Sequence, residues 1–212
     1  MRTAPGVARV GAVFLDRDGV INVNRVDHVK SWEEFAFLPG AIEAIAELTR
    51  AGLDVFVITN QAIVNRGMVP RARVEWINAR MQRVVADHGG RIAAVAYCPH
   101  RVEEGCGCRK PQPGLLLDLA RRHGVDLGTA VLVGDALSDL EAAAAAGCRA
   151  ILVLTGRGRE QLALARAAGR ADLQVAKDLR DAVGTILGRA GAPVAPVTAM
   201  HGGGATLRRL GD

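Results

Sequence analysis

The sequence predicts an α/β protein with a doubly wound, Rossmann-like and mainly parallel sheet. Short apolar runs typical of buried strands alternate with longer segments whose apolar residues recur every three to four positions, as in amphipathic helices. Several of the runs end in a polar cluster, and sheets of this kind bind their ligands at the carboxyl ends of the strands. The chain of 212 residues is long enough for one sizeable core. We therefore expect a single domain over residues 1–189.

Composition narrows the possible functions. Half of the residues are apolar, no apolar run approaches membrane-spanning length, and no export signal precedes the first strand, so we expect a cytoplasmic monomer that does not bind membranes. The net charge is +5, but the arginines are scattered and there is one tyrosine. This pattern argues against nucleic-acid binding and favours an anionic substrate. Residues 190–212, rich in Gly, Pro and Ala, are predicted to form a disordered tail.

The first predicted strand, residues 12–15 (AVFL), leads directly into Asp16, Arg17, Asp18 and Gly19. Alternate residues of a strand point the same way, so the two carboxylates can face one site. Close carboxylates repel each other, which favours either a shared proton or a bound divalent cation. Taken alone, two solvated acids at the end of a strand would be the simpler interpretation.

The second strand is predicted over residues 53–58, after an irregular loop (23–38) and a helix that begins near Pro39. It ends in Thr59-Asn60-Gln61. A hydroxyl and an amide in this place can donate hydrogen bonds to a phosphoryl oxygen, although an ordinary turn would also favour these residue types.

The third strand is predicted over residues 92–97, after a long amphipathic helix that begins at Pro70. We expect Trp76 and Met81 of this helix to be core residues. The strand runs into a segment with Cys98, His100, Cys106 and Cys108. These four ligands form a complete tetrahedral set, which predicts a structural Zn²⁺ site in loop 98–108. A redox pair is the alternative, but Cys-x-Cys lacks the Cys-x-x-Cys spacing, and Cys148 is expected to be a core thiol.

The second half of the chain continues the alternation. Arg109 and Lys110 directly follow the zinc loop, where a cation can hold a phosphate near an acidic metal centre. Further strands are predicted over residues 129–133, 150–154 and 173–175, and helices over 115–123, 142–146 and 178–187. The strand at 129–133 leads to Asp135, which could complete a Mg²⁺ site, and Asp139, which could orient its ligands or a bound water.

Four motifs in this order resemble those of the haloacid dehalogenase superfamily of phosphatases. They are FLDRDGVIN, Thr59, Lys110 and Gly134-Asp135-x-x-x-Asp139, and the resemblance covers about residues 10 to 187. It implies a capless phosphatase in which Asp16 is the phosphoryl-accepting nucleophile and Asp18 the general acid and base. It also implies Mg²⁺ bound by Asp16, Asp135 and the backbone carbonyl of Asp18, with Thr59 and Lys110 holding the transferring group.

The segments FLDRDGVIN, VITNQ and CPH…CGCRKPQPG are similar to those of the D-glycero-D-manno-heptose 1,7-bisphosphate 7-phosphatase family. This similarity implies Mg²⁺-dependent removal of the 7-phosphate from a small phosphorylated sugar in heptose biosynthesis, through an aspartyl-phosphate. It implies substrate contacts from Asn24, Arg25, Asp27, Asn60, Gln61 and Arg109.

Three alternatives remain open at this point. Histidinol-phosphate phosphatases share most of these segments, so the first alternative is an enzyme of that kind or another small phosphomonoesterase. A nucleic-acid 3′-phosphatase or a zinc-organised nucleic-acid-binding module are more distant possibilities. One departure concerns the substrate: the family commonly has a lysine after the fourth-motif aspartate, and this chain has Ala136. The loss of that contact bears on substrate identity and affinity rather than on catalysis.

Overall fold

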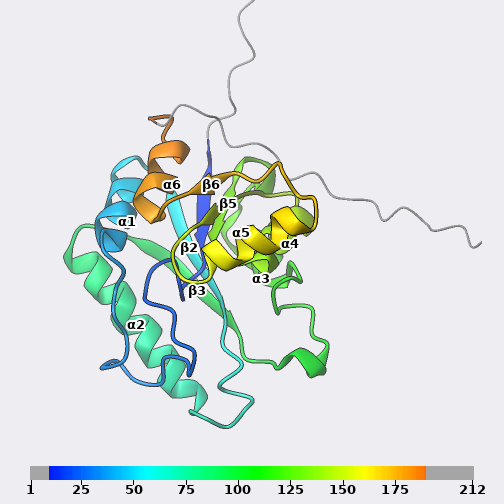
Figure 1. Ribbon diagram of the computed structural model, residues 1–212. Helices are drawn as coiled ribbons and strands as arrows, with labels where there is room; N and C mark the ends of the chain where they lie inside the picture. Colours follow the sequence, from blue (N-terminus) through cyan, green and yellow to red (C-terminus); the bar gives the residue numbers. More distant parts are fainter. Residues whose placement is uncertain (1–9, 190–212) are drawn as a thin grey trace, which may run out of the picture.

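The computed structural model describes residues 10–189, which form a six-stranded parallel sheet with helices on both faces (Figure 1). The strand order is β3-β2-β1-β4-β5-β6. The strands are β1 (Ala12–Leu15), β2 (Asp54–Asn60), β3 (Ile92–Cys98), β4 (Val131–Gly134), β5 (Arg149–Val153) and β6 (Val175–Ala176). The helices are α1 (Ala41–Arg50), α2 (Arg71–Asp87), α3 (Gly114–His123), α4 (Leu137–Ala145), α5 (Gly158–Ala167) and α6 (Leu179–Ile186). The predicted fold class is confirmed.

The apolar strands divide their side chains between two cores. Val13 and Leu15 of β1 belong to the core beneath α1, α2 and α6, whereas Phe14 belongs to the core beneath α3 and α4. Successive side chains of a strand point to opposite faces, so a strand buried on both faces needs a continuous apolar run. The run AVFL meets this requirement, and all four of its residues are buried.

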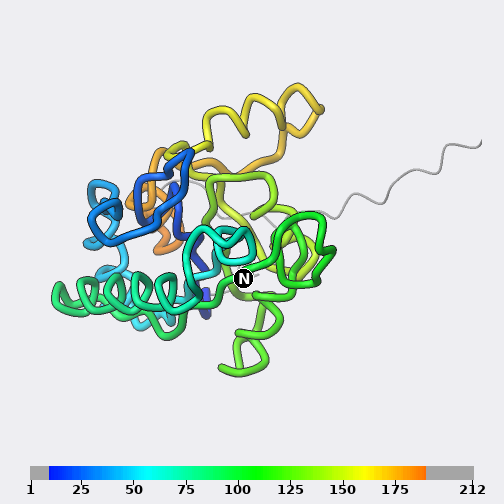
Figure 2. Tube along the Cα trace, turned by 90° about the horizontal axis from the view of Figure 1, so that it is seen from below, coloured from blue at the N-terminus to red at the C-terminus, as the bar shows by residue number. Residues whose placement is uncertain are grey.

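The parallel register brings the carboxyl ends of the central strands together. Leu15 pairs with Val57 of β2 and with Val133 of β4, so the residues that follow these strands emerge at one edge. The Asp16 N–H continues the pairing by donating to the Val133 carbonyl at 2.9 Å. Figure 2, which looks up at this edge, shows the loops after β1, β2 and β3 gathered around it.

Some boundaries differ from the predictions. Strand β2 extends through Thr59 and Asn60, because these residues pair with Tyr97 and Cys98 of β3. Strand β4 begins at Val131, since the Asp126 side chain accepts from Gly128 N–H and starts a short 3-10 turn. Helix α5 was not predicted. Its buried residues are Gly158 and Ala165, so the helix contributes little to the core.

The prediction that Trp76 lies in the core is wrong, because its side chain is 45% exposed. At 100° per residue, position 76 lies about 200° around the helix from Val74, on the side opposite the buried face. The Arg80 guanidinium lies over the rings of both Trp76 and Trp32, 5.4 and 5.1 Å from their centroids. Met81, by contrast, is fully buried as predicted.

Two expectations about the whole chain lie beyond what the structure describes. The predicted tail, residues 190–212, is outside the described range, and the single-domain organisation stays a prediction. Between residues 10 and 189, no helix combines the length and hydropathy needed to cross a bilayer.

Candidate active site

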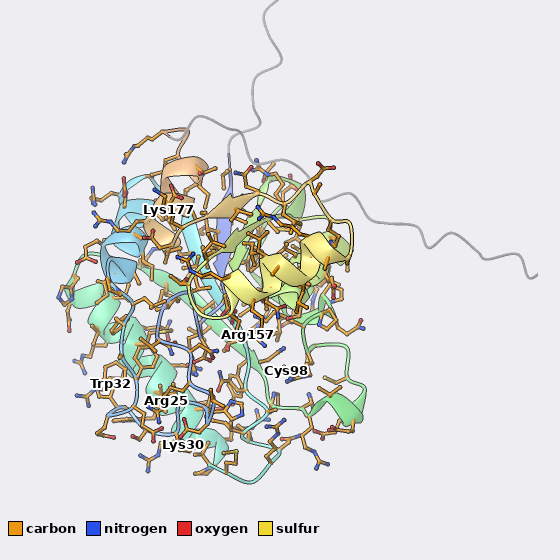
Figure 3. All side chains as sticks on the ribbon, viewed as in Figure 1. Arg25, Lys30, Trp32, Cys98, Arg157 and Lys177 are labelled. Carbon is orange, nitrogen blue, oxygen red and sulfur yellow. The ribbon has the colours of Figure 1, made fainter. Side chains whose placement is uncertain are left out.

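A cavity of about 760 Å³ opens at the carboxyl edge of the sheet. Its floor holds Asp16, Thr59 and Lys110, and its walls come from the loops after β1 and β3 and from the start of α4 and α5. Three guanidinium side chains line it, those of Arg25, Arg109 and Arg157. In Figure 3 Arg157 lies just below α5, with Arg25 and Cys98 on either side in that view. The cavity therefore combines an acidic floor with a cationic wall.

Asp16 is held at the floor of the cavity with little exposure. Its Oδ1 accepts the Arg17 N–H at 2.7 Å and lies 2.9 Å from Lys110 Nζ. Burial raises the pKa of Asp16 to about 7, and the Asp139 and Asp135 carboxylates add to this effect, although Lys110 opposes it. The carboxylate is therefore fixed in orientation, and Lys110 alone does not offset the effects of burial and of the neighbouring carboxylates on its pKa.

Asp16, Asp135 and Asp139 bring carboxylate oxygens within 4.8 Å of one another, all from buried residues. Asp135 Oδ2 accepts the Arg157 N–H at 2.8 Å, but Asp135 Oδ1 has no hydrogen-bond partner among residues 10–189. Burial raises the pKa of Asp135 to about 6. An orphaned oxygen in a buried acidic cluster fits a hard divalent cation such as Mg²⁺.

Lys110 bridges the acidic cluster. Its Nζ lies 2.9 Å from Asp16 and 2.6 Å from Asp139 Oδ1, and donates to the Ile58 carbonyl at 3.2 Å. Burial would lower the pKa of Lys110, but the Asp139 and Asp16 carboxylates raise it above its ordinary value. The lysine is therefore a fixed cation.

Asn60 holds the Lys110 backbone on both sides. The Lys110 N–H donates to Asn60 Oδ1 at 3.1 Å, and Asn60 Nδ2 donates to the Lys110 carbonyl at 3.0 Å. Asn60 also lines the cavity, so these bonds position the lysine, and its contact with substrate stays a prediction.

Asp18 is surrounded by hydrogen-bond donors. Arg17 donates to both carboxylate oxygens, at 3.1 and 2.9 Å, while Asn22 Nδ2 donates to Oδ1 at 2.9 Å and Gln61 Nε2 to Oδ2 at 2.7 Å. Burial alone would raise the pKa of Asp18, but the Arg17 guanidinium and these hydrogen bonds hold it below its ordinary value. Asp18 is a carboxylate in this arrangement.

The turn after Asp18 requires glycine. Gly19 has a φ of 88°, and a Cβ at this position would collide with the Asp135 carboxylate and approach the Gly156 backbone. The bend allows Asp18 and the metal-binding cluster to occupy one edge.

The remaining residues predicted to contact substrate differ in whether they line the cavity. Asn24, Arg25 and Arg109 line the cavity. Gln61 lies beneath it and also donates to Thr59 Oγ1 at 2.9 Å. Asp27 is exposed outside the cavity lining, where its carboxylate binds Arg25 at 3.0 Å and Lys30 at 2.6 Å.

Sequence reasoning missed four residues near the site, Arg17, Asn78, His28 and Arg157. Asn78 could have been identified from the sequence, because it is a polar residue on the apolar face of α2 with Val74, Met81 and Val85. Arg17 gave none, since nothing in its sequence context indicates that it is 1% exposed. His28 and Arg157 line the cavity from loops whose path depends on tertiary packing.

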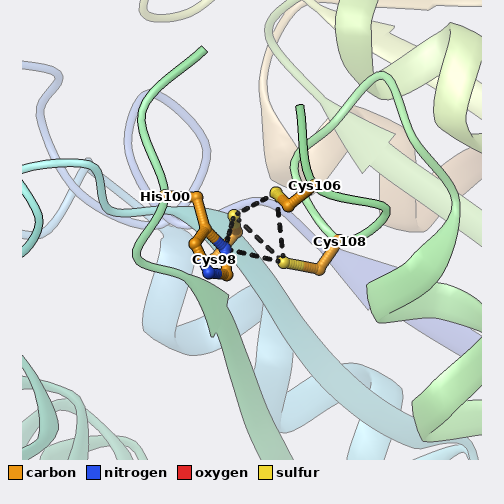
Figure 4. Close-up of side chains that lie close together, drawn as sticks. All are labelled: Cys98, His100, Cys106 and Cys108. Carbon is orange, nitrogen blue, oxygen red and sulfur yellow. Dashed lines mark hydrogen bonds between the residues drawn. The ribbon is translucent and has the colours of Figure 1, made fainter. Parts of the chain in front are cut away.

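The predicted zinc ligands form a compact cluster (Figure 4). Cys98 Sγ lies 3.4 Å from His100 Nδ1, 3.5 Å from Cys106 Sγ and 3.2 Å from Cys108 Sγ. The edge between two thiolates in a tetrahedral zinc site is about 3.7 Å, as follows from Zn–S bonds of about 2.3 Å. Burial would raise the pKa of Cys106, but the Cys108 and Arg109 N–H groups lower it to about 7. The geometry and the donor set fit Zn²⁺.

Together, the parallel sheet, the acidic cluster at its carboxyl edge and the buried Lys110 define a haloacid dehalogenase-like hydrolase. The comparisons with known proteins agree: residues 107–182 match a family described as HAD-hydrolase-like. A crystal structure of D,D-heptose 1,7-bisphosphate phosphatase from Bordetella bronchiseptica, complexed with magnesium and phosphate, superposes with a TM-score of 0.79. The two are 43% identical, and the match covers 85% of this chain and 100% of that one.

Curated relatives narrow the class further. The chain is 46% identical over 146 residues to D-glycero-beta-D-manno-heptose-1,7-bisphosphate 7-phosphatase from Pseudomonas aeruginosa, which covers 69% of this chain and 82% of the relative. It is 42% identical over 148 residues to D-glycero-alpha-D-manno-heptose-1,7-bisphosphate 7-phosphatase from Mycobacterium bovis, which covers 66% of this chain and 78% of the relative. The chain belongs to the heptose-1,7-bisphosphate 7-phosphatase family.

Proposed function

We propose that this protein removes the 7-phosphate from D-glycero-D-manno-heptose 1,7-bisphosphate in a Mg²⁺-dependent reaction. The observation that carries the proposal is the charge distribution of the cavity. At its floor Asp16 is paired with the buried Lys110 and lies beside Asp135, and guanidinium groups line its walls. Such a cavity suits a substrate with one phosphate at the reacting centre and a second phosphate at a distance.

In the first half-reaction Asp16 acts as the nucleophile. One of its carboxylate oxygens attacks phosphorus, the bond between phosphorus and the sugar oxygen breaks, and an aspartyl-phosphate forms. The Arg17 N–H and Lys110 fix the orientation of the carboxylate. Lys110 and Thr59 hold the oxygens of the transferring group, and Asp18 delivers a proton to the leaving sugar oxygen.

In the second half-reaction a water molecule attacks the phosphorus of the aspartyl-phosphate. Asp18 removes a proton from this water, which restores Asp16 and releases phosphate. The structure favours this base role directly, because four hydrogen bonds keep Asp18 in its carboxylate form. The acid role requires that Asp18 receive a proton when substrate binds.

The Mg²⁺ site in this proposal is formed by two carboxylates and one backbone carbonyl. Asp16, Asp135 and the backbone carbonyl of Asp18 would hold Mg²⁺, which neutralises charge on the transferring phosphate when bound. Asp139 lies beside Lys110 rather than free, so it orients the lysine at the edge of the metal site. The structure of the B. bronchiseptica relative contains magnesium and phosphate, which supports the same chemistry here.

The second phosphate distinguishes the heptose substrate from histidinol phosphate. Histidinol phosphate has one phosphate and an ammonium group, which the guanidinium groups of Arg25, Arg109 and Arg157 would repel. A sugar bisphosphate instead presents an anion to them. Arg109 is the best placed for this anion, because it follows the zinc cluster and its NH1 donates to the His100 carbonyl at 3.2 Å. That bond leaves the rest of its guanidinium for a phosphate.

The zinc cluster has a positioning role in this proposal. It occupies the segment immediately before Arg109 and Lys110, so the metal fixes the loop that presents both cations. We also propose that the protein acts in the cytoplasm, where thiols stay reduced and available to zinc, and that it acts as a monomer.

Phosphate release from a substrate panel tests this function. The panel contains the alpha and beta anomers of the heptose bisphosphate, histidinol phosphate and a 3′-phosphorylated oligonucleotide, each with Mg²⁺. We expect kcat/KM to be highest for a heptose bisphosphate, with phosphorus NMR showing loss of the position-7 resonance and retention of the anomeric one. Earlier loss of the anomeric resonance, or faster turnover of histidinol phosphate, would refute the assignment.

A further inference from the structure

A buried arginine outside the cavity controls the surroundings of Asp18. Arg17 is 1% exposed and does not line the cavity, although it stands between the two aspartates of the first motif. Placing an isolated guanidinium in a protein interior costs several kcal/mol unless it is paired and hydrogen-bonded. The partners of Arg17 therefore indicate why the charge is there.

Those partners connect the active site to helix α2. Arg17 NH2 donates to both oxygens of Asp18, at 3.1 and 2.9 Å, and NH1 donates to Asn78 Oδ1 at 3.0 Å. The guanidinium also lies 5.9 Å from the centroid of the Phe35 ring. Within residues 10–189, Asp18 is the only carboxylate that forms an ion pair with the Arg17 guanidinium.

Asn78 is unusual for its position. It is 4% exposed on the apolar face of α2, between Val74 and Met81, and it is not part of the cavity lining. A polar side chain here is stable only if its hydrogen bonds are made, and Arg17 supplies one of them. The chain of contacts from Asn78 through Arg17 to Asp18 is buried except at its last member.

We propose that Arg17 and Asn78 are positioning residues that fix the orientation of the Asp18 carboxylate for proton transfer. This inference rests on the proposed role of Asp18 in the phosphatase reaction. Asn78 fixes NH1 of the rigid, planar guanidinium, and NH2 then holds both oxygens of Asp18 from one side. Asn22 and Gln61 hold the same two oxygens from the other side.

The distinguishing measurement is the dependence on the leaving group. A sugar alkoxide needs a proton as it leaves, whereas 4-nitrophenolate leaves readily without one. Loss of Asp18 positioning should therefore slow transfer from the sugar ester more than transfer from 4-nitrophenyl phosphate. A general loss of fold or of metal would slow both substrates equally.

The experiment compares Asn78→Leu, Arg17→Lys and Arg17→Met with the wild-type protein in single-turnover assays with Mg²⁺. We expect Asn78→Leu to slow transfer from the heptose bisphosphate about tenfold, with KM changed less than twofold and transfer from the aryl phosphate nearly unchanged. Arg17→Met should slow the sugar reaction more than Arg17→Lys does, because lysine keeps the charge. Val74→Ala, one turn earlier on the same buried face, is the matched control and should lower thermal stability without changing the ratio of the two rates.

Asp18→Asn separates failure of this inference from failure of the proposed function. We expect it to show the same selective loss on the sugar ester, and a larger one. If Asp18→Asn is selective but the Arg17 and Asn78 variants slow both substrates equally, the positioning role is wrong and the function stands. If Asp18→Asn itself shows no selectivity, the proton-transfer role of Asp18 is wrong, and the inference falls with it.

Discussion

Two clusters of metal-ligating side chains flank Lys110, and they are built in opposite ways. Asp16, Asp135 and Asp139 are buried and come from the two segments that follow β1 and β4, and Asp135 Oδ1 makes no hydrogen bond within residues 10–189. The second cluster comes from eleven residues of one loop and β3, and three of its four members are partly exposed. It offers four soft ligands in contact with one another.

The two ligand sets determine which of the two metals can take part in the reaction. Four protein ligands complete a tetrahedral zinc site and leave no position for substrate. The carboxylates supply only part of the coordination that Mg²⁺ requires, so phosphate and water can complete it. The closed cluster therefore holds a loop in place, and the open cluster faces the reacting group.

The largest effect is expected for Asp16→Asn in the open cluster. An amide cannot accept the phosphoryl group, so turnover should fall by at least about 10⁴-fold. The fold should persist, because asparagine has the same shape and removes a carboxylate that burial disfavours. Steady-state phosphate release and circular dichroism of the same preparation measure the two results.

Asp18→Asn is the companion variant. It should lose most turnover but can still form the aspartyl-phosphate, which acid quenching would trap. Near-normal turnover by Asp16→Asn in Mg²⁺ would contradict the role of the open cluster.

A smaller effect is expected for Cys108→Ala in the closed cluster. The wild-type protein should carry about one zinc per chain by elemental analysis, and the variant should lose it. The loop that presents Arg109 and Lys110 would then loosen, and a displacement of about 1 Å can cost roughly 100-fold in kcat/KM. Cys148→Ala is the matched control, because Cys148 is a buried thiol outside the cluster and its loss should leave zinc and activity in place. Zinc-free wild-type protein with full activity would show that the cluster does not hold the loop.

Arg109→Ala tests whether the closed cluster delivers a substrate contact. We expect KM for the heptose bisphosphate to rise about tenfold, which corresponds to about 1.4 kcal/mol, while a sugar monophosphate is hardly affected. Arg101→Ala is the control, because Arg101 lies on the same loop with a half-exposed side chain outside the cavity lining. An equal effect on both substrates would mean that Arg109 does not bind the second phosphate.

The strands, the acidic cluster and the zinc cluster could be predicted from the sequence because their residues occur in short, local patterns. The run at 12–15 is apolar on both faces, and the zinc ligands lie within eleven residues. Lys110 was also predicted to point at the acidic centre, and its ion pairs with Asp16 and Asp139 agree with that placement.

What the sequence could not predict depends on residues far apart in the chain. The Arg17 to Asn78 hydrogen bond spans 61 positions, and the Asn60 to Lys110 pair spans 50. Asn60 was predicted to contact substrate because an amide at a strand end can do so, and its pair of hydrogen bonds with the Lys110 backbone, which tertiary packing creates, was not predicted. Asp27 likewise follows the first motif closely, yet it binds Lys30 in its own loop rather than lining the cavity.

The smallest effect concerns how the stability of the Mg²⁺-free protein depends on pH through the open cluster. The pKa of Asp16 is raised to about 7 and that of Asp135 to about 6, from a value of 3.8 that applies to the unfolded chain. Between about pH 4 and pH 7 the folded protein therefore retains protons that the unfolded chain has lost. Stability contributed by these protons is complete below the unfolded pKa and is lost as pH rises through the folded pKa.

The melting temperature of protein dialysed free of Mg²⁺ should accordingly be roughly 5 °C lower at pH 8 than at pH 5.5. This follows from a loss of a few kcal/mol in unfolding free energy for a chain of this size. Dialysis is preferable to a strong chelator, which would also remove zinc. Saturating Mg²⁺ should abolish most of this slope, because it binds the ionised carboxylates and replaces the missing positive charge. The zinc cluster should respond with the opposite sign, since its thiolates lose metal as pH falls.

Asp16→Asn provides the control: without Mg²⁺ it should melt with a much flatter pH dependence than the wild-type protein. A slope unchanged in Asp16→Asn would place its origin outside the carboxylate cluster, and the contrast between an open acidic site and a closed zinc site would then lose its energetic basis.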